Sequence, residues 1–230
     1  MSSILKKFDT PSSLVDNLAS QIIKDLEDAI LKKGEATLLV SGGNTPKPLF
    51  EKLSNIDFQW EKITIALVDE RWIDTTNCNS NENLVKNFLL KNYASKAKFI
   101  GMYILAKEIT ECEEYCSKAY QKLFPFDVII LGMGNDAHTA SLFPNNKRLK
   151  EGFDLDSSAL CLSIEPETAP YTRMSLNLKA ILSADKIYLH IEGQEKFDVY
   201  KKALESKDIY TTPISSVLNS EHKNIEVFYS

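Results

Sequence analysis

Residues Asp127–Pro144, DVIILGMGNDAHTASLFP, are the main indication of the fold, because an apolar run of strand length leads directly into a glycine-rich polar loop. Residues 127–131 form a mostly apolar run of strand length, which predicts a strand covered on both faces. Two glycines follow at once, and Asp136 and His138 come next. Open α/β sheets hold their ligands at the carboxyl ends of parallel strands. The stretch therefore predicts an α/β protein with its chemistry in the loop after this strand.

Strand, loop and helix alternate along the rest of the chain. Thr10 and Pro11 open a predicted helix over 11–33, in which apolar residues recur at helical spacing. Short connections between alternating strands and helices are typical of a mostly parallel sheet with right-handed crossovers. We therefore predict one α/β domain over residues 1–230, with a Rossmann-like sheet and helices on both faces. Its further strands are predicted at 36–40, 63–68, 98–105, 159–164, 173–178, 187–191 and 225–229.

Capping residues predict where further helices begin. Thr45 precedes Pro46 and would cap a helix that starts with this proline. Thr110 and Glu113 have the spacing of a capping box, which predicts another helix start. The predicted helices extend from 46 onward, over 82–93 and over 110–124.

Composition limits the classes of partner. The chain has 230 residues and a formal net charge of −5, so a sequence-independent grip on nucleic acid, which needs clustered basic residues, is not expected. No segment approaches the roughly 20 apolar residues of a membrane span, and the first residues lack the apolar core of a signal peptide. We expect a cytoplasmic protein, monomeric or a small homo-oligomer, whose partner is a small molecule.

The loop Ser41-Gly42-Gly43-Asn44-Thr45 follows a predicted strand and precedes a predicted helix. Its backbone N–H groups and the helix dipole favour a bound anion, and a phosphate would fit. The alternative is a tight turn that needs glycine only for its backbone conformation. The loop lacks both the Lys-Ser/Thr ending of a P-loop and the glycine spacing of a dinucleotide site.

Charged residues follow two other predicted strands. Asp69, Glu70 and Arg71 come directly after the strand at 63–68 and are predicted to open a polar loop that reaches Ser80. The Arg71 guanidinium could bind phosphate with two hydrogen bonds. Lys196 lies at the start of a helix after the strand at 187–191 and could add a second positive charge. Solvated surface charges are the alternative for both segments.

His138 is the residue most suited to catalysis. An imidazole ordinarily titrates near pH 6.5, so it can take a proton from water, and Asp136 could orient it. The alternative is a loop histidine that bonds only to backbone. His190 and His222 are expected to serve structure or to face solvent, and no Gly-x-Ser-x-Gly nucleophile motif is present.

Four motifs together resemble the 6-phosphogluconolactonase family in identity and order. They are SGGNTP at 41–46, DERW at 69–72, LGMGNDAHTASLFP at 131–144 and RMSL at 173–176. The resemblance implies a fold similar to that of the glucosamine-6-phosphate deaminases, and hydrolysis of 6-phospho-δ-gluconolactone in the oxidative pentose phosphate pathway without metal or organic cofactor. It also implies that His138 is the base and Asp136 its neighbour. The substrate-binding residues it implies are Ser41, Gly42, Gly43, Asn44, Thr45, Asp69, Arg71, Arg173 and Lys196.

Two positions depart from the family pattern. Ala137 stands where the family usually has glycine, and Asn44 where serine is common. If position 137 has a positive φ, the alanine costs about 1 kcal/mol there.

The residues leave two alternative functions to consider. An amino-sugar-phosphate deaminase shares the first loop and the Asp-x-His pair, but it places a Glu shortly after the histidine, where this chain has Ser141–Pro144. A non-catalytic sugar-phosphate sensor of a transcription regulator would carry a helix-turn-helix upstream, and only about ten residues precede the first predicted helix.

Overall fold

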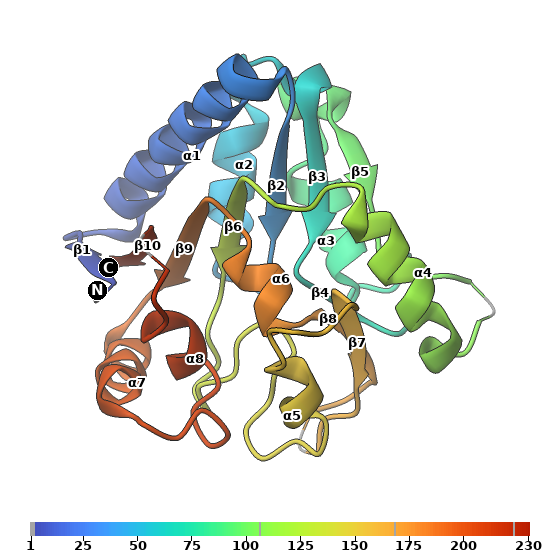
Figure 1. Ribbon diagram of the computed structural model, residues 1–230. Helices are drawn as coiled ribbons and strands as arrows, with labels where there is room; N and C mark the ends of the chain where they lie inside the picture. The colour runs from blue at the N-terminus through green and yellow to red at the C-terminus, as the bar shows by residue number, and fades with distance from the viewer. Residues whose placement is uncertain (1–2, 106, 168, 223) are drawn as a thin grey trace.

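The central sheet of the computed structural model is parallel throughout. The structure describes residues 3–105, 107–167, 169–222 and 224–230, and within them seven strands form this sheet (Figure 1). Every neighbouring pair runs parallel, which confirms the predicted mostly parallel α/β sheet. In spatial order the strands are β1 (Ile4–Lys7), β10 (Ile225–Tyr229), β9 (Lys186–Ile191), β6 (Val128–Leu131), β2 (Ala36–Val40), β3 (Ile63–Leu67) and β5 (Lys98–Ile100).

Helices cover both faces of the sheet (Figure 1). Helix α1 (Pro11–Lys33) has the predicted bounds: the Thr10 side chain accepts a hydrogen bond from the Ser13 N–H, and Gly34 ends the helix with φ 85°. No helix in the described ranges is both long and apolar enough to cross a bilayer. The other helices are α2 (Lys47–Ser54), α3 (Asn81–Phe88), α4 (Ile109–Gln121), α5 (Leu149–Gly152), α6 (Leu178–Leu182), α7 (Gln194–Glu205), α8 (Ser215–Leu218) and the 3₁₀ turns Trp60–Lys62 and Asn92–Lys96.

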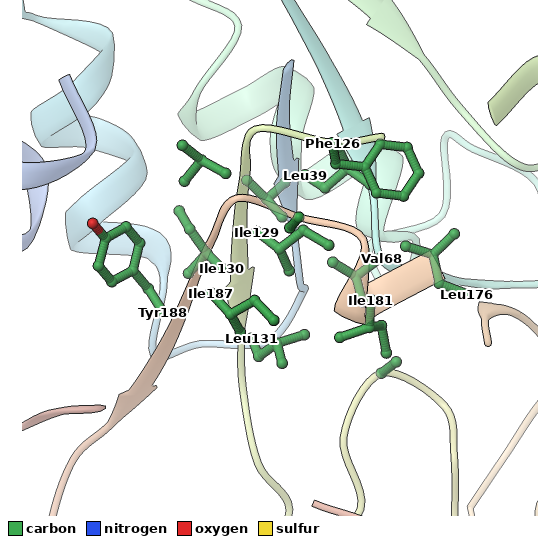
Figure 2. Close-up of a cluster of buried hydrophobic side chains, with 14 of the residues drawn as sticks. Leu39, Val68, Phe126, Ile129, Ile130, Leu131, Leu176, Ile181, Ile187 and Tyr188 are labelled. Atoms are coloured by element: carbon green, nitrogen blue, oxygen red, sulfur yellow. The ribbon is translucent and has the colours of Figure 1, made fainter. Parts of the chain in front are cut away.

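Alternate residues of the central strands pack against opposite helix layers. Ile129 and Leu131 of β6 point toward Ile181 of α6 in Figure 2, and all three are buried. Tyr188 of β9 points the other way, and its hydroxyl donates a hydrogen bond to Asp25 of α1. The strands therefore need apolar residues on both faces, which is why their sequences are continuous apolar runs.

The side of the sheet to which successive strands are added changes between β2 and β6, although the strands stay parallel. From β2 the chain adds β3 and β5 on one side, and then returns to add β6, β9 and β10 on the other. The connections after β2 and β6 therefore diverge and leave a crevice at the carboxyl ends of these two neighbours. The glycine-rich loops at 41–45 and 132–134 begin at this crevice.

A second, antiparallel sheet was not predicted. It consists of β4 (Asp69–Arg71), β8 (Arg173–Leu176) and β7 (Cys161–Ile164). The interpretation of Asp69–Arg71 as a polar loop was therefore wrong: these residues pair with a strand about 100 positions later, where Arg71 lies opposite Arg173. The edge strand β1 was also missed.

Several predicted element ends were wrong. Helix α2 begins after Pro46, without a side-chain cap from Thr45. Helix α4 starts after Glu108, so Thr110 lies inside it; Glu113 instead accepts a hydrogen bond from the Ser163 N–H at 2.8 Å, which removes the predicted capping box. The predicted strand 98–105 ends at residue 100, and the predicted helix 82–93 spans 81–88.

Candidate active site

A cavity of about 420 Å³ opens at the carboxyl ends of β2, β3, β6 and β9. Ten of the eleven predicted site residues line it, and the eleventh, Asp136, lies behind His138. The structure thus brings together segments that are far apart in the sequence. The lining residues among those predicted are Ser41, Gly42, Gly43, Asn44, Thr45, Asp69, Arg71, His138, Arg173 and Lys196.

His138 and Asp136 form a close hydrogen-bonded pair. The His138 Nδ1 lies 2.6 Å from the Asp136 Oδ1, and the same oxygen accepts from the His138 backbone N–H at 3.2 Å. Burial alone would raise the pKa of Asp136, but the hydrogen bonds and charge of His138 outweigh it, so this pKa is lowered. Because an ionised carboxylate can only accept, Nδ1 is assigned as the donor of this hydrogen bond, and Nε2 is then the ring nitrogen that can act as a base.

A tight turn presents this pair to the cavity. The Gly134 N–H donates to the His138 carbonyl at 2.9 Å, and the Ala137 N–H donates to the Gly134 carbonyl at 3.0 Å. A Cβ at position 134 would overlap both the imidazole and the Asp136 carboxylate. Ala137 has φ 68°, so the condition for backbone strain at this position is met. Glycine at 134 is therefore a requirement of the pair, whereas alanine at 137 is tolerated.

The loop 41–45 joins β2 to α2. Gly43 has φ 102°, a conformation that favours glycine. Gly42 faces the Asn81 side chain so closely that a Cβ would overlap it. The Ser41 hydroxyl is buried and has no hydrogen-bond partner among the described residues. The loop lies before the amino end of α2, where the helix dipole favours an anion.

Two buried carboxylates hold the neighbouring segments in place. Asp69 accepts from the Ser141 hydroxyl at 2.6 Å with one oxygen and from the Asn81 amide at 3.2 Å with the other. Glu70 is fully buried and accepts from the N–H groups of Asn81 and Glu82, both at 2.7 Å. Burial raises the pKa of Glu70, and these hydrogen bonds oppose the rise. Asp69 and Glu70 therefore tie the start of α3 to β4.

Three cationic side chains reach the cavity. Arg71 and Arg173 lie opposite each other in the small sheet, and the Nε of each is buried without a partner in the described ranges. Burial lowers the pKa of Arg173, and the charge of Arg71 lowers it further. Lys196 of α7 donates to the Met133 carbonyl, and burial lowers its pKa. The cavity therefore combines positive charge with unused donors, which suits an anionic ligand.

Some cavity residues were missed by sequence reasoning. The Phe143 ring packs on His138 with 4.5 Å between ring centroids, and Asn81 lines the wall beside Gly42. His190 and Glu192 at the end of β9 also line the cavity. The strand pattern shows that His190 is buried, but it does not show what the imidazole faces.

Fold and cavity together define an α/β protein with a polar ligand site at the switch point of its sheet, and comparison with known proteins gives the family. The family profile described as glucosamine-6-phosphate isomerases/6-phosphogluconolactonase matches residues 9–227. The chain belongs to this family.

Its relatives in the family include several 6-phosphogluconolactonases. The protein of that name from Rhizobium meliloti is 36% identical over 231 residues and covers 100% of both chains. The one from Pseudomonas putida is 36% identical over 94% of this chain and 88% of its own. The crystal structure of a 6-phosphogluconolactonase from Shewanella baltica has a TM-score of 0.96 at 41% identity, covering 99% of this chain and 97% of that one. A monomeric glucosamine-6-phosphate deaminase shares the fold, with a TM-score of 0.82 at 17% identity.

Proposed function

We propose that this chain hydrolyses 6-phospho-D-glucono-1,5-lactone to 6-phosphogluconate, a step of the oxidative pentose phosphate pathway. The observation that carries the proposal is the Asp136–His138 pair beside a cavity lined by Arg71, Arg173 and Lys196, in which the Nε of each arginine has no partner in the described ranges. The names of the relatives in the family support the same reaction. The single catalytic unit over residues 1–230 and the cytoplasmic location stay predictions.

His138 acts as the general base. Its Nε2 takes a proton from a water molecule while the water oxygen forms a bond to the lactone carbonyl carbon. Asp136 keeps the other ring proton on Nδ1 and stabilises the imidazolium that results. The negative charge on the carbonyl oxygen is stabilised by a guanidinium, from Arg71 or Arg173. The ring C–O bond then breaks, and the imidazolium returns the proton to the leaving oxygen.

The rest of the cavity positions the substrate. The loop 41–45 and Lys196 hold the phosphate, together with whichever of Arg71 and Arg173 does not face the carbonyl oxygen. Because the phosphate is remote from the reacting carbon, its binding energy orients the carbonyl toward His138. A lactone is an activated ester, so the mechanism uses no covalent nucleophile, metal or organic cofactor.

The deaminase alternative is disfavoured by the segment after His138. That reaction class calls for a carboxylate close behind the histidine, and residues 139–144 contain none. Phe143 occupies this position and packs on the imidazole. The ring is therefore covered by an apolar side chain where the rival reaction needs an acid.

The test is the hydrolysis of freshly generated 6-phospho-δ-gluconolactone, followed as proton release above the spontaneous rate. EDTA is present, and glucosamine 6-phosphate is tested separately. We expect acceleration that EDTA does not affect and no deamination. Binding of 6-phosphogluconate without acceleration would refute the proposal and favour a sensor.

A further inference from the structure

His190 lies on the cavity wall without a role in the mechanism above. It is near the carboxyl end of β9 and only 3% of its surface is exposed. Leu189 pairs with Leu131 of β6, and the residues that follow them, His190 and Gly132, both line the cavity. A Cβ at Gly132 would meet no atom within 4 Å, so the space next to Gly132 is open. The imidazole therefore borders free volume rather than packed core.

Only one ring nitrogen of His190 has a protein partner in the described ranges. Nε2 lies 3.0 Å from the Glu192 Oε1, whereas Nδ1 is buried and unpaired there. An unpaired buried polar atom is costly, and native proteins hold few of them. Four of the seven such atoms found in the described ranges belong to residues of this cavity, namely Ser41, Arg71, Arg173 and His190. The clustering indicates that a polar ligand completes these hydrogen bonds.

The position of His190 relates it to the anion-binding loop. Val40, Ile130 and Tyr188 are register partners across β2, β6 and β9. Two residues further along each segment stand Gly42, Gly132 and His190. These three residues line the same cavity, so His190 and the loop 41–45 share one ligand space.

Glu192, the partner of His190, also lines the cavity. A carboxylate on the wall of an anion site would repel a phosphate. His190 offers a different ring nitrogen to each group: Nε2 bonds to Glu192, and Nδ1 is the nitrogen left to donate to a phosphoryl oxygen. We propose that His190, held by Glu192, is an additional phosphate-binding residue of this site. The proposal rests on the proposed function in taking the ligand to be a sugar phosphate.

The test measures the binding of inorganic phosphate and of 6-phosphogluconate by calorimetry to wild type and to His190→Leu. Leucine is of similar size to histidine, suits a buried strand position and lacks the two ring nitrogens. Losing a charge-assisted hydrogen bond is expected to raise both dissociation constants about 10- to 100-fold. The variant should also lose kcat/KM for the lactone by a similar factor, because the phosphate contact helps to bind and orient the substrate. His222→Gln is the matched control, since His222 bonds to the Ala184 carbonyl outside this cavity, and it should change neither constant.

Glu192→Gln is a second variant, at a partly exposed side chain, in case His190→Leu does not fold. It should weaken phosphate binding about 3- to 10-fold, because the loss of the charged acceptor that holds the His190 ring outweighs the repulsion of the phosphate that is removed with it. Unchanged phosphate affinity in folded His190→Leu, or in Glu192→Gln if the first variant does not fold, would overturn the proposal. Weaker binding of 6-phosphogluconate alone would also overturn it and assign His190 to the sugar. Calorimetry needs no turnover, so failure of the lactonase reaction would be recognised separately.

Discussion

Gly134→Ala gives the sharpest test of how the catalytic pair is held. A Cβ at this position would lie well inside the 3.0 Å that real Cβ atoms keep from the His138 ring and from the Asp136 carboxylate. Position 134 has no positive φ, so the substitution brings little backbone strain of its own. The added methyl group therefore acts on the pair itself.

The expected effect follows from the overlap. To restore contact distance the imidazole has to move by about 1 Å, and a misplacement of this size costs about 100-fold in rate. We expect kcat for 6-phospho-δ-gluconolactone to fall about 100-fold. The dissociation constant of 6-phosphogluconate should stay within about threefold, because the loop 41–45, Arg71 and Lys196 are not displaced. Stopped-flow proton release and calorimetry measure the two quantities.

Gly132→Ala is the steric control. It makes the same chemical change two residues earlier, where a Cβ meets nothing within 4 Å. The NMR signal of the His138 Nδ1 proton should be unchanged in Gly132→Ala and should lose its hydrogen-bonded shift in Gly134→Ala. A Gly134→Ala enzyme that retains this signal and wild-type kcat would show that the turn yields without moving the imidazole, and the reasoning would fail.

Three further changes test the scaffold around the pair. Glu70→Gln replaces one acceptor oxygen by a donor and leaves a buried N–H such as that of Glu82 unpaired, so urea unfolding should show a loss of about 1–3 kcal/mol; no loss would contradict the role assigned to Glu70. The pKa of Asp136 is lowered, so its ionised form stabilises the fold at pH values above the ordinary pKa of 3.8. This stabilisation is lost as the pH falls through the lowered pKa. The stability difference between wild type and Asp136→Asn should therefore shrink below pH 3.8, and a difference independent of pH would refute this linkage. Ala137→Gly relieves about 1 kcal/mol of left-handed backbone strain, but it removes a buried methyl group and gives the unfolded chain more freedom. The free energy of unfolding should therefore change by no more than about 1 kcal/mol. A change above about 2 kcal/mol in thermal unfolding would contradict this balance.

The strongest sequence signals were local, and the structure confirms them. Helix α1 is predicted from Thr10 to its last turn because the cap and the helical spacing both lie within the segment. The run at 128–131 is apolar because both faces of β6 are covered. The crevice follows from the same information, since ligands bind where parallel strands end.

Long-range pairing could not be predicted from such signals. The sequence of Asp69–Arg71 is polar, and only the pairing of these residues with β8 about 100 positions later makes them a strand. Glu113 has the spacing of a helix cap, but its carboxylate forms an ion pair with Arg148 and accepts a hydrogen bond from the Ser163 N–H, and both partners lie outside its own helix. In both cases the deciding partner is distant along the chain, so no pattern within the segment could reveal it.

The polar residues of the cavity divide by what their hydrogen bonds already do. Both carboxylate oxygens of Asp69 and of Glu70 accept hydrogen bonds from protein groups, so these two residues build the walls. Ser41, Arg71, Arg173 and His190 each keep a buried polar atom without a protein partner in the described ranges. Folding such groups without partners lowers stability, so their concentration at one cavity is explained if the ligand supplies the missing partners. Residue type alone cannot make this division, because Asp69 and Arg71 stand two positions apart in one charged segment. Only the three-dimensional contacts show that both oxygens of Asp69 already accept hydrogen bonds, whereas the Nε of Arg71 has no partner in the described ranges.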